Sequence, residues 1–507
     1  MEKRLLLAIA LSLLVLLSWS AFASKTQHVD NKAVATNQVF QKEPIQPNEK
    51  MSNQALLPTE PKASLLQVNR KNMELYFDEA HAAINKVVFK GFQDHSFPLK
   101  WGFFSDDANL KYVKTSSGPE QVIFTAQDNS KKITKRFIFS NSDYTIDLQT
   151  KIENFSASPL IINPTLILGV LNFSGSNEQS RYQDAYVVNP EKSLHLSVAK
   201  EYHGEKTKIL GFRDRYFCFI VEPIKNPSSA FIKRLDNSES EIGFYSDEVV
   251  LQPKAQIGHL FRAYIGPQDL KIINSINPNW SGIIYYGTFD FISQLLLQAL
   301  EFLHSLFHNW GWSIVILSVL VYLILYPLSI KQMRSMKEMQ AIQPKVEALR
   351  KLYKDNPQKM NKEIMELYRL HKVNPFGGCL PLLLQMPIFF ALYNTLMRSV
   401  ALRGAQFLWI KDLSEPDRLF TLPVSLPLLG NEFNILPIVM ALGMFFQQKL
   451  TSASNSGASA EQQKMMLIIM PVMFGFIFYR MPSGLVLYWL INSMLMLVFQ
   501  LRMNRAK

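Results

Sequence analysis

Residues 312–330, WSIVILSVLVYLILYPLSI, decide the fold class of this 507-residue chain. The stretch contains no Asp, Glu, Lys, Arg or His, and as a helix it would measure about 28 Å at 1.5 Å per residue. That length matches the hydrocarbon core of a bilayer, which is about 30 Å thick. Further apolar stretches lie at residues 5–22, 380–397, 433–446, 465–479 and 485–501. The sequence therefore predicts a membrane protein with six spanning helices.

The charged residues between these stretches predict the topology. The segment 331–373 holds 11 basic and 5 acidic residues, and the tail 501–507 is also basic. The segment 398–432, in contrast, holds four residues of each sign. Loops rich in Lys and Arg stay in the cytoplasm. We therefore expect a bacterial inner-membrane protein with both termini in the cytoplasm and residues 24–310 in the periplasm.

The N-terminal segment 1–23 fits either a cleaved signal peptide or an uncleaved transmembrane anchor. Its apolar run follows the charged sequence MEKR and ends at AFA (21–23), which has the small-x-small pattern of a signal-peptide cleavage site. An uncleaved transmembrane anchor is the alternative. Residues 24–62 are rich in Gln, Asn, Lys, Pro and Ser, a composition that predicts a flexible periplasmic tether.

Residues 63–287 change to short apolar runs separated by turns, such as VIF (122–124) and FIF (137–139). This spacing predicts a large antiparallel β-sandwich. No catalytic triad pattern, phosphate loop or metal-ligand motif is found in its sequence, so a folding or docking module is favoured and a ligand-binding cleft is the alternative. The two cysteines, Cys218 and Cys379, cannot form a disulfide framework or a four-ligand zinc site. We expect no metal and no cofactor.

Residues 288–310 form a candidate amphipathic helix. Polar residues recur at spacings of three and four from Asp290 to His308, and apolar residues lie between them. We expect such a helix to lie along the outer membrane–water boundary. Packing against the β-domain is the alternative.

The apolar stretches within 311–502 contain no Asp, Glu, Lys, Arg or His. Proton-coupled transporters usually place ionisable groups at membrane depth, and intramembrane proteolysis needs a nucleophile with a base or a pair of carboxylates. Both the transporter and the enzyme interpretations are therefore disfavoured, and we expect no catalytic residue.

Uncharged polar residues do occur in these stretches. Ser318, Tyr322 and Tyr326 follow one another at spacings of four and share one helical face. Gln385 lies on the next stretch, and the last one carries Tyr488 and Asn492. A hydrated groove and ordinary hydrogen bonding between helices both fit this pattern.

The basic segment 331–373 predicts a helical hairpin on the cytoplasmic face. Apolar residues recur at helical spacing in both halves; Pro344 is expected to interrupt the first half, and Asn356-Pro357 to separate the two. The positive surface fits contact with anionic lipid, ribosomal RNA or an acidic partner, and a merely solvated face is the alternative. The residues expected to make such contacts are Lys331, Arg334, Lys345, Arg350 and Lys351.

Four motifs in residues 310–502 resemble the YidC membrane protein insertase family, in the Gram-negative form that has a large periplasmic domain. They are KVNPFGGCLPLLLQMPIF (372–389), YPL (326–328), QPK (343–345) and MPSGLVLY (481–488). The order of an N-terminal anchor, a β-domain and five spans is also similar. The resemblance implies a membrane α-helical bundle of six transmembrane helices, five of which (311–502) form the insertase core, with a periplasmic β-supersandwich and a short basic tail (503–507).

The resemblance also implies a function that needs no chemical catalysis. In this family a hydrophilic groove, open to the cytoplasm and to lipid, receives a polar segment of the substrate, whose apolar span then slides into the bilayer. The implied partners are nascent membrane proteins and the Sec translocon, together with the ribosome, a targeting receptor and anionic lipids; no DNA is expected. The residues expected to line the groove are Ser318, Tyr322, Tyr326, Gln385, Tyr488 and Asn492.

One position departs from the family pattern. Members typically carry a groove arginine four residues before the YPL motif, where this chain has Tyr322. Electrostatic capture of acidic substrate segments is therefore in doubt, whereas a hydroxyl-lined groove still lowers the cost of burying peptide groups. Two other functional classes stay open, a transporter or channel and a scaffold for the assembly of other membrane complexes.

Overall fold

The computed structural model describes most of the chain from Leu65 to Arg505. The described ranges are 65–92, 95–97, 99–105, 110–140, 144–172, 182–226, 228–354, 356–371, 380–426, 430–452 and 460–505. The predicted anchor, the predicted tether and the motif residues 372–379, which include Cys379, lie outside these ranges.

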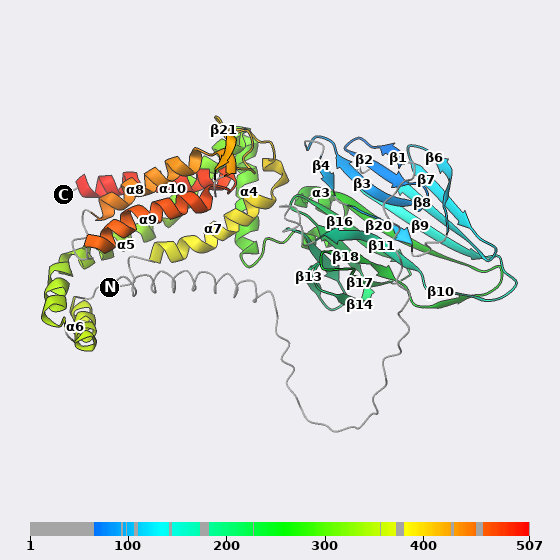
Figure 1. The fold of residues 1–507 in the computed structure, drawn as a ribbon, viewed down its shortest axis with the longest axis horizontal. Coiled ribbons are helices and arrows are strands. Elements are labelled where there is room, and N and C mark those ends of the chain that lie inside the picture. Colours follow the sequence, from blue (N-terminus) through cyan, green and yellow to red (C-terminus); the bar gives the residue numbers. More distant parts are fainter. Residues whose placement is uncertain are drawn as a thin grey trace, which may run out of the picture. The chain divides into compact units, whose positions relative to one another are not determined.

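The part of the chain up to Pro267 forms the β-domain (Figure 1). Its strands are β1 Leu65–Asn69, β2 Met73–Asp78, β3 Ala83–Phe89, β4 His95–Phe97, β5 Phe104–Ser105, β6 Val113–Ser117, β7 Gln121–Gln127, β8 Lys131–Phe139, β9 Thr145–Asn154, β10 Leu160–Ile162, β11 Thr165–Asn172, β12 Asp184–Val188, β13 Ser193–Ser197, β14 Tyr202–Thr207, β15 Ile209–Arg213, β16 Phe217–Lys225, β17 Ser228–Arg234, β18 Glu239–Tyr245, β19 Val249–Leu251 and β20 Gln256–Pro267.

These strands pair antiparallel into sheets that share one hydrophobic core. A nine-stranded sheet has the order β13-β12-β15-β16-β20-β9-β8-β7-β6, and a five-stranded sheet has the order β14-β17-β18-β11-β5. Strands β1 to β4 form a third sheet. Side chains from all three, such as Phe137, Ile232 and Phe77, belong to the same buried cluster. The predicted β-rich domain is therefore confirmed.

Strand β8 illustrates how the sequence dictates this packing. Ile133, Phe137 and Phe139 lie an even number of positions apart and are all buried on one face of the strand, while Arg136 is exposed on the other. The reason is that successive side chains of a strand point to opposite faces. The two apolar runs noted in the sequence meet across the sheet, where Val122 of β7 pairs with Phe137.

The rest of the described chain is mainly helical. Its elements are α3 Leu270–Ile276, η1 Pro278–Ile283, α4 Asp290–Phe307, α5 Trp310–Leu352, α6 Pro357–Leu370, α7 Leu380–Arg398, η3 Val400–Leu402, β21 Phe420–Leu426, β22 Gly430–Phe433, α8 Leu436–Ser452, α9 Ala460–Phe478 and α10 Ser483–Arg505. Buried residues of α5, α7 and α10, such as Leu317, Leu392 and Leu485, form a second hydrophobic cluster. Strands β21 and β22 form an antiparallel hairpin that the sequence analysis did not anticipate.

Helix α4 matches the predicted amphipathic segment. Leu296, Leu300 and Leu303 are buried in the cluster formed by the helices. Another row remains apolar but uncovered, and Phe291 and Phe302 on it are 82% and 63% exposed. This uncovered row suits the predicted position at a membrane–water boundary, which stays a prediction.

Helix α5 runs for 43 residues and contains both Pro327 and Pro344. The expectation that Pro344 interrupts the first half of the hairpin is therefore wrong. A proline removes one main-chain hydrogen bond and can bend a helix, yet the turns on either side keep their own bonds. The predicted break at Asn356-Pro357 is confirmed, because the Asn356 side chain accepts a hydrogen bond from the Lys359 amide at 3.1 Å and Pro357 begins α6.

Among the described residues, two helical stretches are long and apolar enough to cross a membrane, Trp310–Ile330 and Ser483–Arg502. Two shorter apolar helical stretches are Leu436–Leu450 and Leu467–Phe478. The count of six spans remains a prediction.

Candidate functional site

A hydrogen bond between two helices joins Gln385 of α7 to Tyr488 of α10. The Gln385 side-chain amide donates to the Tyr488 hydroxyl over 2.7 Å. Tyr488 is fully buried, and one turn later the Asn492 side chain donates to the Tyr488 carbonyl at 2.9 Å. Three of the six residues expected to line the groove therefore lie together, on two helices that are distant in sequence.

The stripe on α5 has a different character. The Ser318 hydroxyl is buried and donates to the Ile314 carbonyl at 2.7 Å, so its hydrogen bond is satisfied within its own helix. The ring centroids of Tyr322 and Tyr326 lie 6.2 Å apart, and Tyr326 also packs edge-on against Phe499 of α10 at 5.2 Å. Thus Tyr326 connects the α5 stripe to α10 through ring packing.

The hydroxyl of Tyr322 is a buried polar atom of this stripe. It is buried and makes no hydrogen bond within the described part of the chain. A buried hydroxyl without a partner is unfavourable by about 1–3 kcal/mol. A peptide group of another polypeptide could satisfy it, and that makes Tyr322 the most informative residue of the candidate groove.

Of the five residues predicted to make contacts on the hairpin, the structure describes the side chains of three. Lys345 of α5 lies 3.0 Å from the His371 ring nitrogen just after α6, so it links the two halves of the hairpin. Arg350 and Lys351 are exposed near the end of α5. Lys331 and Arg334 belong to α5, but their side chains lie outside what the structure describes.

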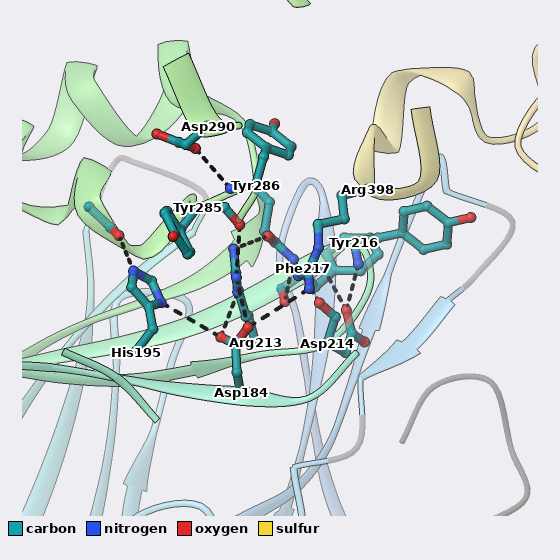
Figure 2. Close-up of polar contacts among 12 residues, drawn as sticks. Asp184, His195, Arg213, Asp214, Tyr216, Phe217, Tyr285, Tyr286, Asp290 and Arg398 are labelled. Atoms are coloured by element: carbon teal, nitrogen blue, oxygen red, sulfur yellow. Dashed lines mark hydrogen bonds and ion pairs between the residues drawn. The ribbon is translucent and has the colours of Figure 1, made fainter. Parts of the chain in front are cut away.

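The sequence analysis missed a charged cluster where the β-domain meets the helices (Figure 2). Arg213, at the end of β15, is 2% exposed and donates two hydrogen bonds to the Asp184 carboxylate at 2.6 and 2.7 Å. It also donates to the Tyr285 carbonyl, in the linker that leads to α4, at 3.0 Å. Arg398, the last residue of α7, lies 3.8 Å from Oδ2 of Asp184, the oxygen that also accepts the 2.7 Å bond from Arg213.

The electrostatics of this cluster hold Asp184 in its charged form. Burial alone would raise the pKa of Asp184, but the Arg213 guanidinium, with help from His195 and Arg398, holds that pKa well below its usual range. A sequence signal did exist. The charged run Arg213-Asp214-Arg215, whose first residue ends β15, separates the apolar residues of β15 from those of β16.

Comparisons with known proteins cover both halves of the chain. A family model described as "60Kd inner membrane protein" matches residues 302–507, and one described as "YidC periplasmic domain" matches residues 88–299. A membrane protein insertase YidC of Ralstonia nicotianae is 34% identical over 457 residues, which cover 85% of this chain and 79% of the relative. The same-named protein of Syntrophobacter fumaroxidans is 35% identical and covers 80% and 74%.

A further relative and a solved structure extend over nearly the whole chain. The membrane protein insertase YidC of Pelobacter propionicus is 31% identical over 550 residues, covering 100% of this chain and 99% of the relative. A crystal structure described as an active YidC insertase with its first transmembrane domain resolved is 21% identical, covers 87% of this chain and 93% of its own, and superposes with a TM-score of 0.42.

Proposed function

Because this chain belongs to the YidC family of membrane protein insertases, we propose that it inserts its clients by sheltering a polar segment against α5, α7 and α10. The chain is an inner-membrane insertase, and its substrates are membrane proteins. The transporter or channel alternative is not favoured, since the similar proteins are insertases over most of their length.

The proposed topology places five spans in the core and one in the N-terminal anchor. Residues 331–373 and both termini face the cytoplasm, because these parts hold the excess of basic residues. The β-domain then lies in the periplasm, in keeping with the match of residues 88–299 to a periplasmic domain model. Helix α4, with its uncovered row of apolar side chains, rests at the periplasmic surface of the bilayer.

The physical problem for an insertase is the transfer of polar main chain through lipid. Each peptide group without a hydrogen bond costs several kcal/mol in hydrocarbon. Uncharged hydroxyl and amide groups lower that cost without holding the client tightly. We propose that the groove consists of Ser318, Tyr322, Tyr326, Gln385, Tyr488 and Asn492 and that no chemical step is involved.

The observation that carries this proposal is the Tyr322 hydroxyl, which is buried and has no hydrogen-bond partner among the residues that the structure describes. It lies one helical turn from Tyr326, which is 37% exposed and gives the stripe an accessible end. A client peptide group that bonds this hydroxyl removes two unsatisfied groups at once. After this contact the apolar span of the client moves sideways into lipid.

Site-specific photocrosslinking tests the groove. A crosslinker at Tyr322 or Gln385 is expected to capture a nascent single-span client during insertion into proteoliposomes. Ile324 is the matched control, because it lies on the same helix but is 74% exposed. Capture confined to position 324 would contradict the groove and favour insertion along the outer surface of the bundle.

The partners of the hairpin are proposed on charge. Exposed Arg350 and Lys351, with Lys345, Lys331 and Arg334 on the same helix, suit anionic lipid headgroups, the ribosome or an acidic targeting receptor. Clients larger than one span are expected to need the Sec translocon beside this chain. Replacing the five basic residues by Gln should weaken ribosome co-sedimentation, and unchanged co-sedimentation at low salt would remove the ribosome from this group.

A further inference from the structure

Arg215 connects the β-domain to the end of helix α7. The residue follows β15 in the turn that leads to β16, and it is 5% exposed. Its guanidinium donates to the Met397 carbonyl at 2.9 Å, near the last residue of α7. The last carbonyls of a helix have no partner within the helix and carry the negative end of its dipole, so a buried cation is favourable there.

The same guanidinium also binds the loop that follows η3. It donates to the Ser414 carbonyl at 2.7 Å and to the Glu415 carboxylate at 3.0 Å. The neighbouring Tyr216 hydroxyl donates to the Ser414 hydroxyl at 3.2 Å. Ser414 and Glu415 are therefore attached to the β-domain by main-chain, side-chain and charged contacts.

This loop in turn holds the start of helix α10. The Ser483 amide donates to the Glu415 carbonyl at 2.8 Å, and the Gly484 amide donates to the Leu413 carbonyl at 2.9 Å. The contact is close, since a Cβ on Gly484 would lie 3.1 Å from the Leu413 carbonyl oxygen. Arg215 therefore binds the end of α7 directly and is connected to the beginning of α10 through this loop.

The turn that presents Arg215 is itself rigid. The Asp214 carboxylate accepts hydrogen bonds from the Tyr216 and Phe217 amides at 2.8 and 2.7 Å (Figure 2). Phe217 stacks on Phe89 of β3 with ring centroids 4.0 Å apart. A side chain that leaves a fixed turn loses little conformational freedom when it binds, which strengthens the contact.

We propose that Arg215 is a positioning residue for insertion, which sets the separation of α7 and α10 at the groove. The two helices meet a second time at the hydrogen bond between Gln385 and Tyr488, about 18 Å along α7 from Met397 at 1.5 Å per residue. Two ties fix both the distance and the relative tilt of the helices, whereas one tie leaves the tilt free. The role in insertion rests on the proposed groove. The effect of Arg215 on the separation of α7 and α10, called the clamp below, does not.

Two measurements on the full-length protein test this role. Spin labels at Asn394 of α7 and Met494 of α10, with Cys379 replaced by Ser, report the spacing of the helices in proteoliposomes. The rate of insertion of a single-span client reports function. Arg215→Ala is expected to broaden the distance distribution and to slow insertion roughly three- to tenfold, the range in which linked networks modulate a site.

Two further variants provide the comparison. Arg215→Lys keeps the charge but loses the fork that binds three acceptors, so an intermediate broadening and rate are expected. Arg262→Ala removes an ion pair with Asp147 elsewhere on the β-domain, where the arginine side chain is 48% exposed, and is expected to change neither measurement.

The outcomes separate the clamp from the groove. An Arg215→Ala protein that stays folded by protease resistance but keeps the wild-type distance distribution overturns the proposal. Slower insertion without a change in distance also overturns it, since the effect would then arise elsewhere. If distances broaden in Arg215→Ala while the crosslinker at Tyr322 in the parent protein captures no client, the clamp stands and the groove fails.

Discussion

The β-domain and the space between α5, α7 and α10 bury their polar groups in opposite ways. Inside the β-domain, Lys135 is fully buried and donates to the Phe103 carbonyl at 2.8 Å, and Arg213 is paired with Asp184. Between the helices, the corresponding groups are the neutral Gln385 and Tyr488, together with Tyr322, whose hydroxyl has no partner in the described part of the chain. A charge inside a protein needs a dedicated partner. A neutral hydroxyl can remain without one and stays available to a passing chain.

The strongest test of this contrast removes one partner of the buried pair. Arg213→Ala leaves the Asp184 carboxylate without its main counter-ion, and it should lower the free energy of unfolding of the β-domain by about 3 kcal/mol. Arg262→Ala, which breaks a pair whose arginine side chain is 48% exposed, should cost less than about 1 kcal/mol. Denaturant titration followed by protease resistance measures both, and equal losses would show that burial of the pair is unimportant.

The second test concerns the neutral side of the contrast. Tyr322→Phe removes a buried hydroxyl that has no hydrogen-bond partner among the described residues, so the helices should become more stable, by about 1–3 kcal/mol. Insertion should nevertheless slow, by roughly fivefold if one hydrogen bond to the client is lost. The rate of client protection from protease measures the effect, and Tyr245→Phe at the end of β18, outside the proposed groove, is the control. An unchanged rate of client insertion would show that Tyr322 acts only in packing between the helices.

The smallest expected effect is the pH dependence of the charged cluster. The folded-state pKa of Asp184 is lowered, so its contribution to stability is complete above the pKa of an unfolded Asp, near 3.9. It is lost as the pH falls through the lower folded-state value. The thermal unfolding temperature of the β-domain should therefore decrease below about pH 4. Asp184→Asn should remove that part of the pH dependence of stability. A wild-type profile in the Asn variant would contradict this assignment.

Local pattern was enough to predict much of the fold. Short apolar runs separated by turns predicted strands such as β7 and β8, and hydrophobic spacing predicted α4. The relevant forces act between residues two to four apart, so the sequence displays them directly. Pro344 was misjudged because proline weakens a helix by only one bond, and the neighbouring turns decide whether it continues.

The sequence indicated which polar residues belong to the candidate site, but it did not indicate which of them form hydrogen bonds with each other. Polarity inside apolar stretches singled out Gln385 and Tyr488, yet nothing in the spacing showed that they bond to each other. Ser318 was chosen on the same pattern, and it bonds its own helix. Arg215 was missed altogether, because its acceptors at Met397 and Ser414 lie nearly two hundred residues away. Contacts at such separations depend on the assembled fold and leave no periodic trace.

The unbroken course of helix α5 has a mechanical consequence. Its 43 residues make a rod about 65 Å long, roughly twice the thickness of the hydrocarbon layer. A lever of that length carries a small swing at the basic end, where Arg350 and Lys351 stand, to the tyrosines near its other end. A ribosome or receptor that pulls on the hairpin would therefore move the tyrosines directly, except for the part of the motion that bending at Pro327 and Pro344 absorbs.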